Sequence, residues 1–162
     1  MSHRIIVGVD GSAHSIAALR WAVDDAATRK QAEVIAVLAW RMPLVSNPAA
    51  FDREELQRAY EKLLTETVSD AFPSPHVPVR TCVVAGDPID VLVEASRDAQ
   101  LLVVGSRGRS PFAGLILGAV SQACAARAAC PVVVVKQPDT EHDRDAAGAP
   151  AYVRAGLRME TA

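Results

Sequence analysis

Apolar residues recur along this chain in two alternating patterns. Short unbroken apolar runs are typical of strands buried on both faces of a sheet. These runs lie at residues 4–9, 34–40, 79–85, 101–104 and 131–135. The stretches between them carry apolar residues at helical spacing and predict helices. The helices are expected at residues 13–30, 51–72 and 119–129, with a further one opening at residues 86–88. Strands that alternate with helices imply right-handed crossovers and a parallel sheet.

Local signals mark where the helices begin and which face is buried. Residues 10–12 form a turn and cap signal, and Pro88 suits the first turn of a helix. The apolar stripe of the second helix is predicted at Leu56, Tyr60, Leu63, Thr67 and Ala71. In a parallel sheet, ligands bind beyond the carboxyl ends of the strands, where the strand order switches. Candidate functional residues are therefore expected at residues 10–12, 40–42, 86–87 and from 105 onward.

Composition favours one domain. The chain has 162 residues, of which 50% are hydrophobic, enough for a real core. The body is expected at residues 1–137, and residues 138–162, rich in Ala, Gly, Asp and Arg, are expected to be a flexible tail. The net charge of −2 does not favour nucleic-acid binding, which wants a basic face.

Nothing in the sequence suggests export or a membrane. The first apolar run is too short for a signal peptide, and no window reaches the length that spans a bilayer. The three cysteines are odd in number and form no CxxC pair. A cytoplasmic location is therefore expected, and Cys82, Cys124 and Cys130 are expected to be small buried apolar residues.

The segment that carries chemistry is the glycine-containing loop at residues 105–121, GSRGRSPFAGLILGAVS. Its glycines let a backbone approach a ligand, and Gly118 lies just before a helix whose first N–H groups attract phosphate. Arg107 and Arg109 would add charge, and Ser106 and Ser121 would add hydroxyl groups. The alternative is an ordinary strand-to-helix loop with glycines at its turns.

The spacing of Gly105, Gly108 and Gly118 resembles the phosphate loop of the universal stress protein family. The turn at residues 9–12, the Gly-Asp-Pro at residues 86–88 and the closing run at residues 130–135 also resemble that family, so the likeness covers residues 3–136. It implies a Rossmann-like α/β fold, a five-stranded parallel sheet in the order 3-2-1-4-5 with helices on both faces. It also implies homodimers and, in one branch, binding of ATP, possibly with Mg²⁺.

The resemblance implies a set of nucleotide-binding positions. Asp10 corresponds to a position near ribose and adenine, and Ala39 and Trp40 to the end of the second strand beside adenine. Gly105 corresponds to a ribose contact, and Gly108, Gly118 and Ser121 to contacts near the phosphates. The full candidate set is Asp10, Gly11, Ser12, Ala39, Trp40, Gly105, Arg107, Gly108, Gly118, Ala119, Val120 and Ser121. One departure stands out, because the family has Ser or Thr where this chain has Ala119.

Other candidate residues have structural explanations. Ser12 is expected to cap the first helix, and Asp87 to cap the third rather than help to hold a metal. His14 is expected to be a solvated side chain. The chain has no GxxxxGK[ST] and no GxGxxG after a strand, and no nucleophile–base pair is visible.

The sequence therefore predicts a nucleotide-binding regulatory protein of the stress-response type, with at most slow hydrolysis of ATP. The alternative is an interaction module of the same fold that has lost nucleotide binding. An enzyme of a related fold is disfavoured by the missing catalytic motifs. The strand at residues 131–135 is expected to form a sheet edge and to pair with a second copy of the chain.

Overall fold

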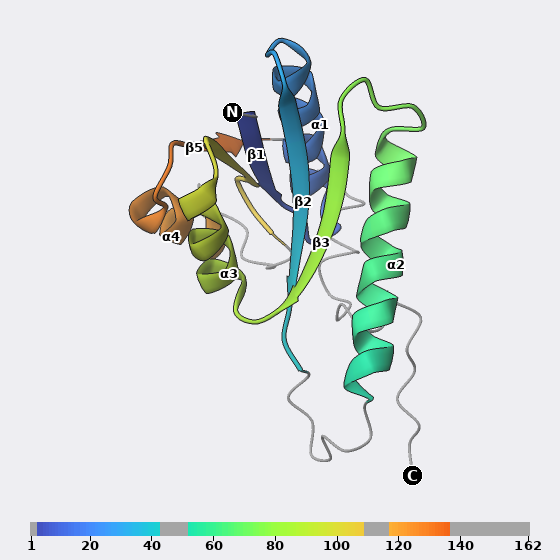
Figure 1. Cartoon of the computed structure of the whole chain (residues 1–162). Helices are drawn as coiled ribbons and strands as arrows, with labels where there is room; N and C mark the ends of the chain where they lie inside the picture. Colours follow the sequence, from blue (N-terminus) through green and yellow to red (C-terminus); the bar gives the residue numbers. More distant parts are fainter. Residues whose placement is uncertain (1–2, 43–51, 109–116, 137–162) are drawn as a thin grey trace.

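The computed structural model describes residues 3–42, 52–108 and 117–136. Its centre is a five-stranded sheet in the order β3-β2-β1-β4-β5, in which all paired strands run parallel (Figure 1). The strands are β1 (His3–Gly8), β2 (Ala32–Trp40), β3 (Val79–Ala85), β4 (Leu101–Gly105) and β5 (Val132–Val135). The predicted strand order is confirmed, and the predicted limits of β3 coincide with the observed ones.

Four helices connect the strands in the order that the sequence predicts. They are α1 (Ala13–Ala27), α2 (Arg53–Ala71), α3 (Pro88–Ala95) and α4 (Ala119–Arg127), with a short 3₁₀ turn η2 (Ser96–Asp98) after α3. The first three begin at side-chain caps, because Ser12, Asp52 and Asp87 accept backbone N–H bonds from Ser15, Glu54 and Ile89. The capping roles expected for Ser12 and Asp87 are therefore confirmed.

The C-terminal ends of two helices come earlier than predicted. α1 stops at Ala27, three residues short of residue 30, because the Thr28 hydroxyl donates to the Asp25 carbonyl and Gln31 takes a left-handed φ of 54°. α4 stops at Arg127 rather than 129, since Ala128 already has an extended backbone before Pro131. Helix ends are set by such local bonds, which apolar periodicity does not report.

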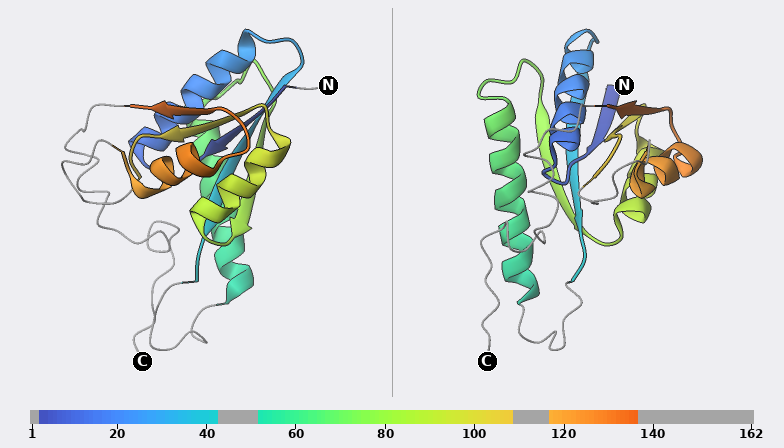
Figure 2. Two further views of the ribbon diagram at one scale, coloured as in Figure 1. Left: turned by 90° about the vertical axis from the view of Figure 1, so that its left-hand side faces the viewer. Right: turned by 180° about the vertical axis from the view of Figure 1, so that it is seen from behind.

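Helices cover the sheet on both faces. α1 and α2 pack on one face, over a core that includes Ile5, Val34 and Leu64. α3 and α4 lie side by side on the other, over a core that includes Ile6, Leu102 and Cys124 (Figure 2). In the sheet, β1 lies between β2 and β4: the strands β2 and β3 are added on one side of β1, and β4 and β5 on the other. The strand order therefore switches at the carboxyl ends of β1 and β4. That switch point is where α/β sheets bind ligands.

The predicted apolar stripe of α2 is correct at its start and one residue out of phase in its middle. Leu56 and Tyr60 are buried as expected, but the next buried residue is Leu64, fully enclosed, whereas Leu63 is only half-buried. Tyr60 stacks on Trp40 of β2 with ring centroids 5.5 Å apart. The buried residues of the helix, Leu56, Tyr60 and Leu64, are thus spaced four apart, and the i±4 row of side chains packs on the sheet.

The cysteines do not all share the buried environment that the sequence predicts. Cys124 is fully buried, and burial raises the pKa of its thiol to about 11, against a smaller opposing effect of Arg127. Cys82 is exposed because β3 is an edge strand that α3 does not reach. Cys130 lies between these extremes. The prediction was thus wrong for Cys82, where periodicity cannot tell an edge strand from a central one.

The phase of α2 can be tested by truncating its two adjacent leucines. Leu64→Ala should lower the free energy of unfolding by about 2–5 kcal/mol, because it opens a cavity in a closed core. Leu63→Ala should cost about 1 kcal/mol, a typical value for a partly exposed site. Urea unfolding followed by circular dichroism measures both. Equal losses at the two positions would contradict this packing.

Candidate functional site

A pocket of about 280 Å³ opens at the carboxyl end of the sheet, between the N-terminal ends of α3 and α4. It is built from the ends of β1, β2 and β4, from the segments that follow β1 and β4, and from the starts of α3 and α4. The lining residues are Gly8, Val9, Asp10, Ser15, Val37, Ala39, Pro88, Leu92, Val104, Gly105, Arg107, Gly108, Gly118, Ala119, Val120 and Ser121. Nine of the twelve candidate site residues are in that set, all but Gly11, Ser12 and Trp40.

One side of the pocket is apolar. This side is formed by Val37 and Ala39 of β2, by Pro88 and Leu92 of α3, and by Val104 of β4. Gly8 makes this wall possible, since a Cβ there would lie 2.9 Å from Leu92 Cδ1. Such a surface suits a flat apolar ring. Of this wall, the sequence had identified only Ala39, because the other residues look like ordinary core positions.

The other side of the pocket is polar and is formed by Asp10 and the glycine loop. One Asp10 carboxylate oxygen accepts the Ser12 N–H at 3.0 Å. The second lies where a side chain on Gly108 would collide with it, with a Cβ 2.9 Å from Asp10 Oδ2. A larger residue at position 108 would therefore displace the Asp10 carboxylate from its place beside the loop backbone.

The base of the glycine loop is closed by hydrogen bonds centred on Ser106. The Gly118 N–H donates to the Ser106 carbonyl at 2.7 Å, and the Ser106 N–H donates to the Val135 carbonyl at 2.7 Å. Gly118 itself has an ordinary φ of −75°, and a Cβ there would meet nothing closer than 3.5 Å. Gly118 is therefore not required by the backbone conformation, and a side chain there would meet only ordinary contacts.

The N-terminus of α4 faces the pocket without a side-chain cap. Gly118 is the N-cap residue, and no side chain caps the helix within the part of the chain that the structure describes. The next residues, Ala119 and Val120, line the pocket. A helix start leaves its first N–H groups without partners inside the helix and carries partial positive charge. The pocket therefore offers backbone donors for an anion.

Ser121 lies at the pocket, but its hydroxyl points into the protein. Its Oγ donates toward the carbonyls of Gly118 at 2.9 Å and Ser106 at 3.1 Å, and the residue is 2% exposed. A serine hydroxyl has one hydrogen, so in this arrangement it holds the loop base and has none to donate to a ligand.

Three candidate residues lie elsewhere for identifiable reasons. Ser12 caps α1, and Gly11 takes a left-handed φ of 81° in the turn before it. Trp40 is turned to the α2 side of the sheet, where its Nε1 donates to Gln57 Oε1 at 2.7 Å. Arg109 falls outside the described residues. Sequence position near a strand end did not reveal which face each side chain takes.

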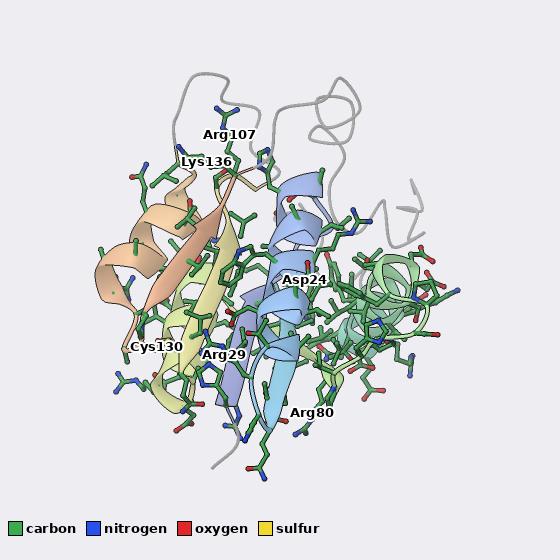
Figure 3. The ribbon with its side chains drawn as sticks, turned by 90° about the horizontal axis from the view of Figure 1, so that it is seen from above. Asp24, Arg29, Arg80, Arg107, Cys130 and Lys136 are labelled. Carbon is green, nitrogen blue, oxygen red and sulfur yellow. The ribbon has the colours of Figure 1, made fainter. Side chains whose placement is uncertain are left out.

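Two basic side chains, Arg107 and Lys136, lie at the end of the sheet that holds the pocket. Figure 3 shows Arg107, after β4, near Lys136, after β5, whereas Arg29 and Arg80 lie at the opposite end. Arg107 lines the pocket. Arg41, which follows β2, forms an exposed ion pair with Asp87 at 3.1 Å. Among the described residues that line the pocket, Arg107 is the one cation and Asp10 the one carboxylate.

His14 is the largest departure from the sequence-based expectation. It is 4% exposed rather than solvated, and its Nδ1 lies 3.2 Å from Ser106 Oγ. This is a serine–histidine pair, which the sequence analysis did not find because the two residues are 92 positions apart. Ser106 is only 3% exposed and neither residue lines the pocket, so the pair has no access to a substrate.

Within the described residues, no group of three or more His, Cys, Asp or Glu is placed to hold a metal ion. No described helix is both long and apolar enough to cross a membrane.

Taken together, the fold and the pocket define a doubly wound α/β domain with a glycine-loop pocket at its switch point. The family model described as "Universal stress protein family" matches residues 1–136. The chain belongs to the universal stress protein family.

Curated and solved relatives agree with this assignment. Universal stress protein Rv2623 of Mycobacterium tuberculosis is 37% identical over 134 residues, which are 82% of this chain and 45% of that protein. The chain thus spans about half the length of such relatives. A universal stress protein solved in complex with cAMP is 29% identical, with a TM-score of 0.61 over 83% of this chain and 97% of that chain. A family protein from Arabidopsis thaliana with AMP bound is 22% identical, with a TM-score of 0.59 over 86% and 94% of the two chains.

Proposed function

We propose that this domain binds an adenine nucleotide, ATP with Mg²⁺ foremost, in the pocket between α3 and α4, and acts as a nucleotide-dependent regulator. The observation that carries the proposal is the pairing of an apolar wall with an uncapped helix start in one pocket. A nucleotide has the matching halves, a flat base and an anionic phosphate chain. Two family structures contain cAMP and AMP, which supports an adenine nucleotide as the ligand.

The pocket assigns each half of the nucleotide its own contacts. The base would pack on Val37, Ala39 and Leu92, where no charge needs to be desolvated. Asp10 would accept hydrogen bonds from the ribose hydroxyls. The phosphates would meet the N–H groups of Ala119 and Val120 and the charge of Arg107.

Mg²⁺ fits this arrangement. Mg²⁺ is commonly held by one or two carboxylates together with substrate phosphates, and it keeps several waters. Asp10 is the carboxylate that lines the pocket, and one of its oxygens lies against Gly108. In the Mg²⁺ complex, Asp10 would hold the ion together with the phosphates instead of bonding the ribose hydroxyls, and the ion would offset the repulsion between phosphate and carboxylate.

The alternative function is an interaction module of the same fold without a nucleotide. Two observations favour it: Ala119 has no hydroxyl, and the Ser121 hydroxyl donates inward. Denaturing the purified protein and identifying any released nucleotide by mass spectrometry separates the two functions. Calorimetric titration with AMP, cAMP and ATP, each with and without Mg²⁺, follows on nucleotide-free protein. No binding of any of the three would contradict the proposed function.

Gly118→Val tests the location of the site. An added side chain meets only ordinary contacts, so the fold should be retained. The isopropyl group would nevertheless narrow the gap between α4 and the Arg107 backbone, and we expect ATP binding to be lost in calorimetry. Ala125→Val, at an exposed position of α4, is the matched control and should bind normally. Unchanged affinity in Gly118→Val would place the nucleotide elsewhere.

Ala119→Ser tests the missing hydroxyl. A hydrogen bond to a charged group is worth about 1.5–3 kcal/mol, so ATP binding should tighten by up to about ten- to a hundredfold. Dissociation constants from calorimetry compare the variant with the unmodified protein. If the variant binds no tighter, the phosphates do not reach the first turn of α4.

We also propose that the protein forms homodimers through β5. β5 is an edge strand, and its four valines are all only partly buried within one chain. An open apolar edge invites pairing with another strand, and a two-fold axis would join β5 to its copy. The rival is that residues 138–162, outside the described residues, cover this edge.

Light scattering on the whole chain and on a chain ending at residue 137 distinguishes the two. A dimer in both forms is the expected result, because the strand alone provides the interface. Val134→Lys in the whole chain should then give a monomer, because a charged side chain on an edge strand disfavours its pairing with another strand. A monomer in both the whole and the shortened chain would contradict pairing through β5.

A further inference from the structure

The buried pair of His14 and Ser106 joins three elements at the base of the glycine loop. The Ser106 side chain meets His14 of α1, its N–H donates to Val135 at the end of β5, and its carbonyl accepts from Gly118 before α4. One residue thus ties α1, β5 and the start of α4 together. His14 is the side chain that meets the Ser106 hydroxyl in this arrangement.

The first turn of α1 lies unusually close to the end of β4. A Cβ on Gly105 would come within 2.7 Å of the His14 carbonyl carbon and 2.8 Å of its oxygen. Because the neighbour is backbone, neither side can move away easily. His14 therefore stands on a rigid support, and its ring can fix the position of Ser106.

Because His14 and Ser106 are both buried, loss of the hydrogen bond between them is costly. His14 is 4% exposed and Ser106 is 3% exposed, so water cannot readily replace either partner. A buried polar group that loses its partner costs more than the bond itself contributes. If the bond is lost, Ser106 must shift to find another partner, and the Gly118 N–H and the start of α4 shift with its carbonyl.

We propose that His14 is a positioning residue for nucleotide binding: by holding Ser106, it fixes the base of the glycine loop and the N–H groups of α4 that face the pocket. His14 does not touch the nucleotide, because it does not line the pocket. This inference rests on the proposed function and goes beyond it. It assigns a role in affinity to a residue outside the binding surface.

The test is a set of variants titrated with AMP and with ATP by calorimetry. His14→Leu removes the ring nitrogen and should weaken binding by about three- to tenfold, the size of one hydrogen bond. His14→Asn can place an oxygen or nitrogen near the former Nδ1 and should restore affinity. Ser106→Ala should weaken binding as His14→Leu does, and the double variant should bind no worse than either single one, because both changes remove the same bond.

A control separates positioning from general stability. Ser96 is 0% exposed, and its Oγ donates to Val93 and accepts from Ala129, near the opposite end of β4. Ser96→Ala should therefore lower the melting temperature without changing the dissociation constant. If Ser96→Ala weakens binding as much as His14→Leu, or if the His14 and Ser106 effects simply add, the positioning role is overturned.

Amide hydrogen exchange on the nucleotide-free protein gives an independent readout. His14→Leu should raise exchange at the N–H groups of Ser106 and Gly118, whereas His14→Asn should not. If the unmodified protein binds no nucleotide, the proposed function fails, and exchange still shows whether His14 holds the loop. Unchanged exchange at both amides in His14→Leu would overturn the inference.

Discussion

The pocket depends on one backbone hydrogen bond, from the Gly118 N–H to the Ser106 carbonyl at 2.7 Å. This bond brings the two ends of the glycine loop together and sets where α4 begins. Without it, the first N–H groups of α4 would have no fixed direction. The Ser121 hydroxyl strengthens the same junction by donating to both neighbouring carbonyls.

The start of α4 differs from the starts of the other three described helices. α1, α2 and α3 start at side-chain caps, so their first turns are satisfied within the protein. α4 starts at a glycine, and its donors face the pocket. Gly8 allows Leu92 to close the apolar side, and Gly108 allows Asp10 to approach the polar side. Small residues at these two points therefore shape the pocket more than any charged side chain does.

The sequence was sufficient for the fold and for most of the lining, but not for side-chain direction. Apolar runs, cap residues and glycine spacing report local geometry, so the strands, the helix starts and the loop were predictable, whereas the strand order came from the family resemblance. Trp40 was assigned to the pocket because it ends β2, yet period-two alternation turns it to α2, while its neighbour Ala39 faces the pocket. His14 was missed because its partner is 92 residues away, and no local pattern records such a contact.

The backbone N–H groups that we propose for the phosphates also explain how the site would bind a nucleotide without a hydroxyl group at Ala119. A hydroxyl at that position would be one donor among several, whereas the backbone N–H groups stay in place whatever the side chain. The Asp10 carboxylate is the stronger constraint, because it would repel a phosphate placed beside Gly108. A ligand can avoid that repulsion by directing its ribose hydroxyls to Asp10 or by bringing a cation. In the proposed complex, both solutions would keep the anion at α4 and the base on the apolar wall, so the position of Asp10, more than the loss of one hydroxyl, would govern which nucleotides fit.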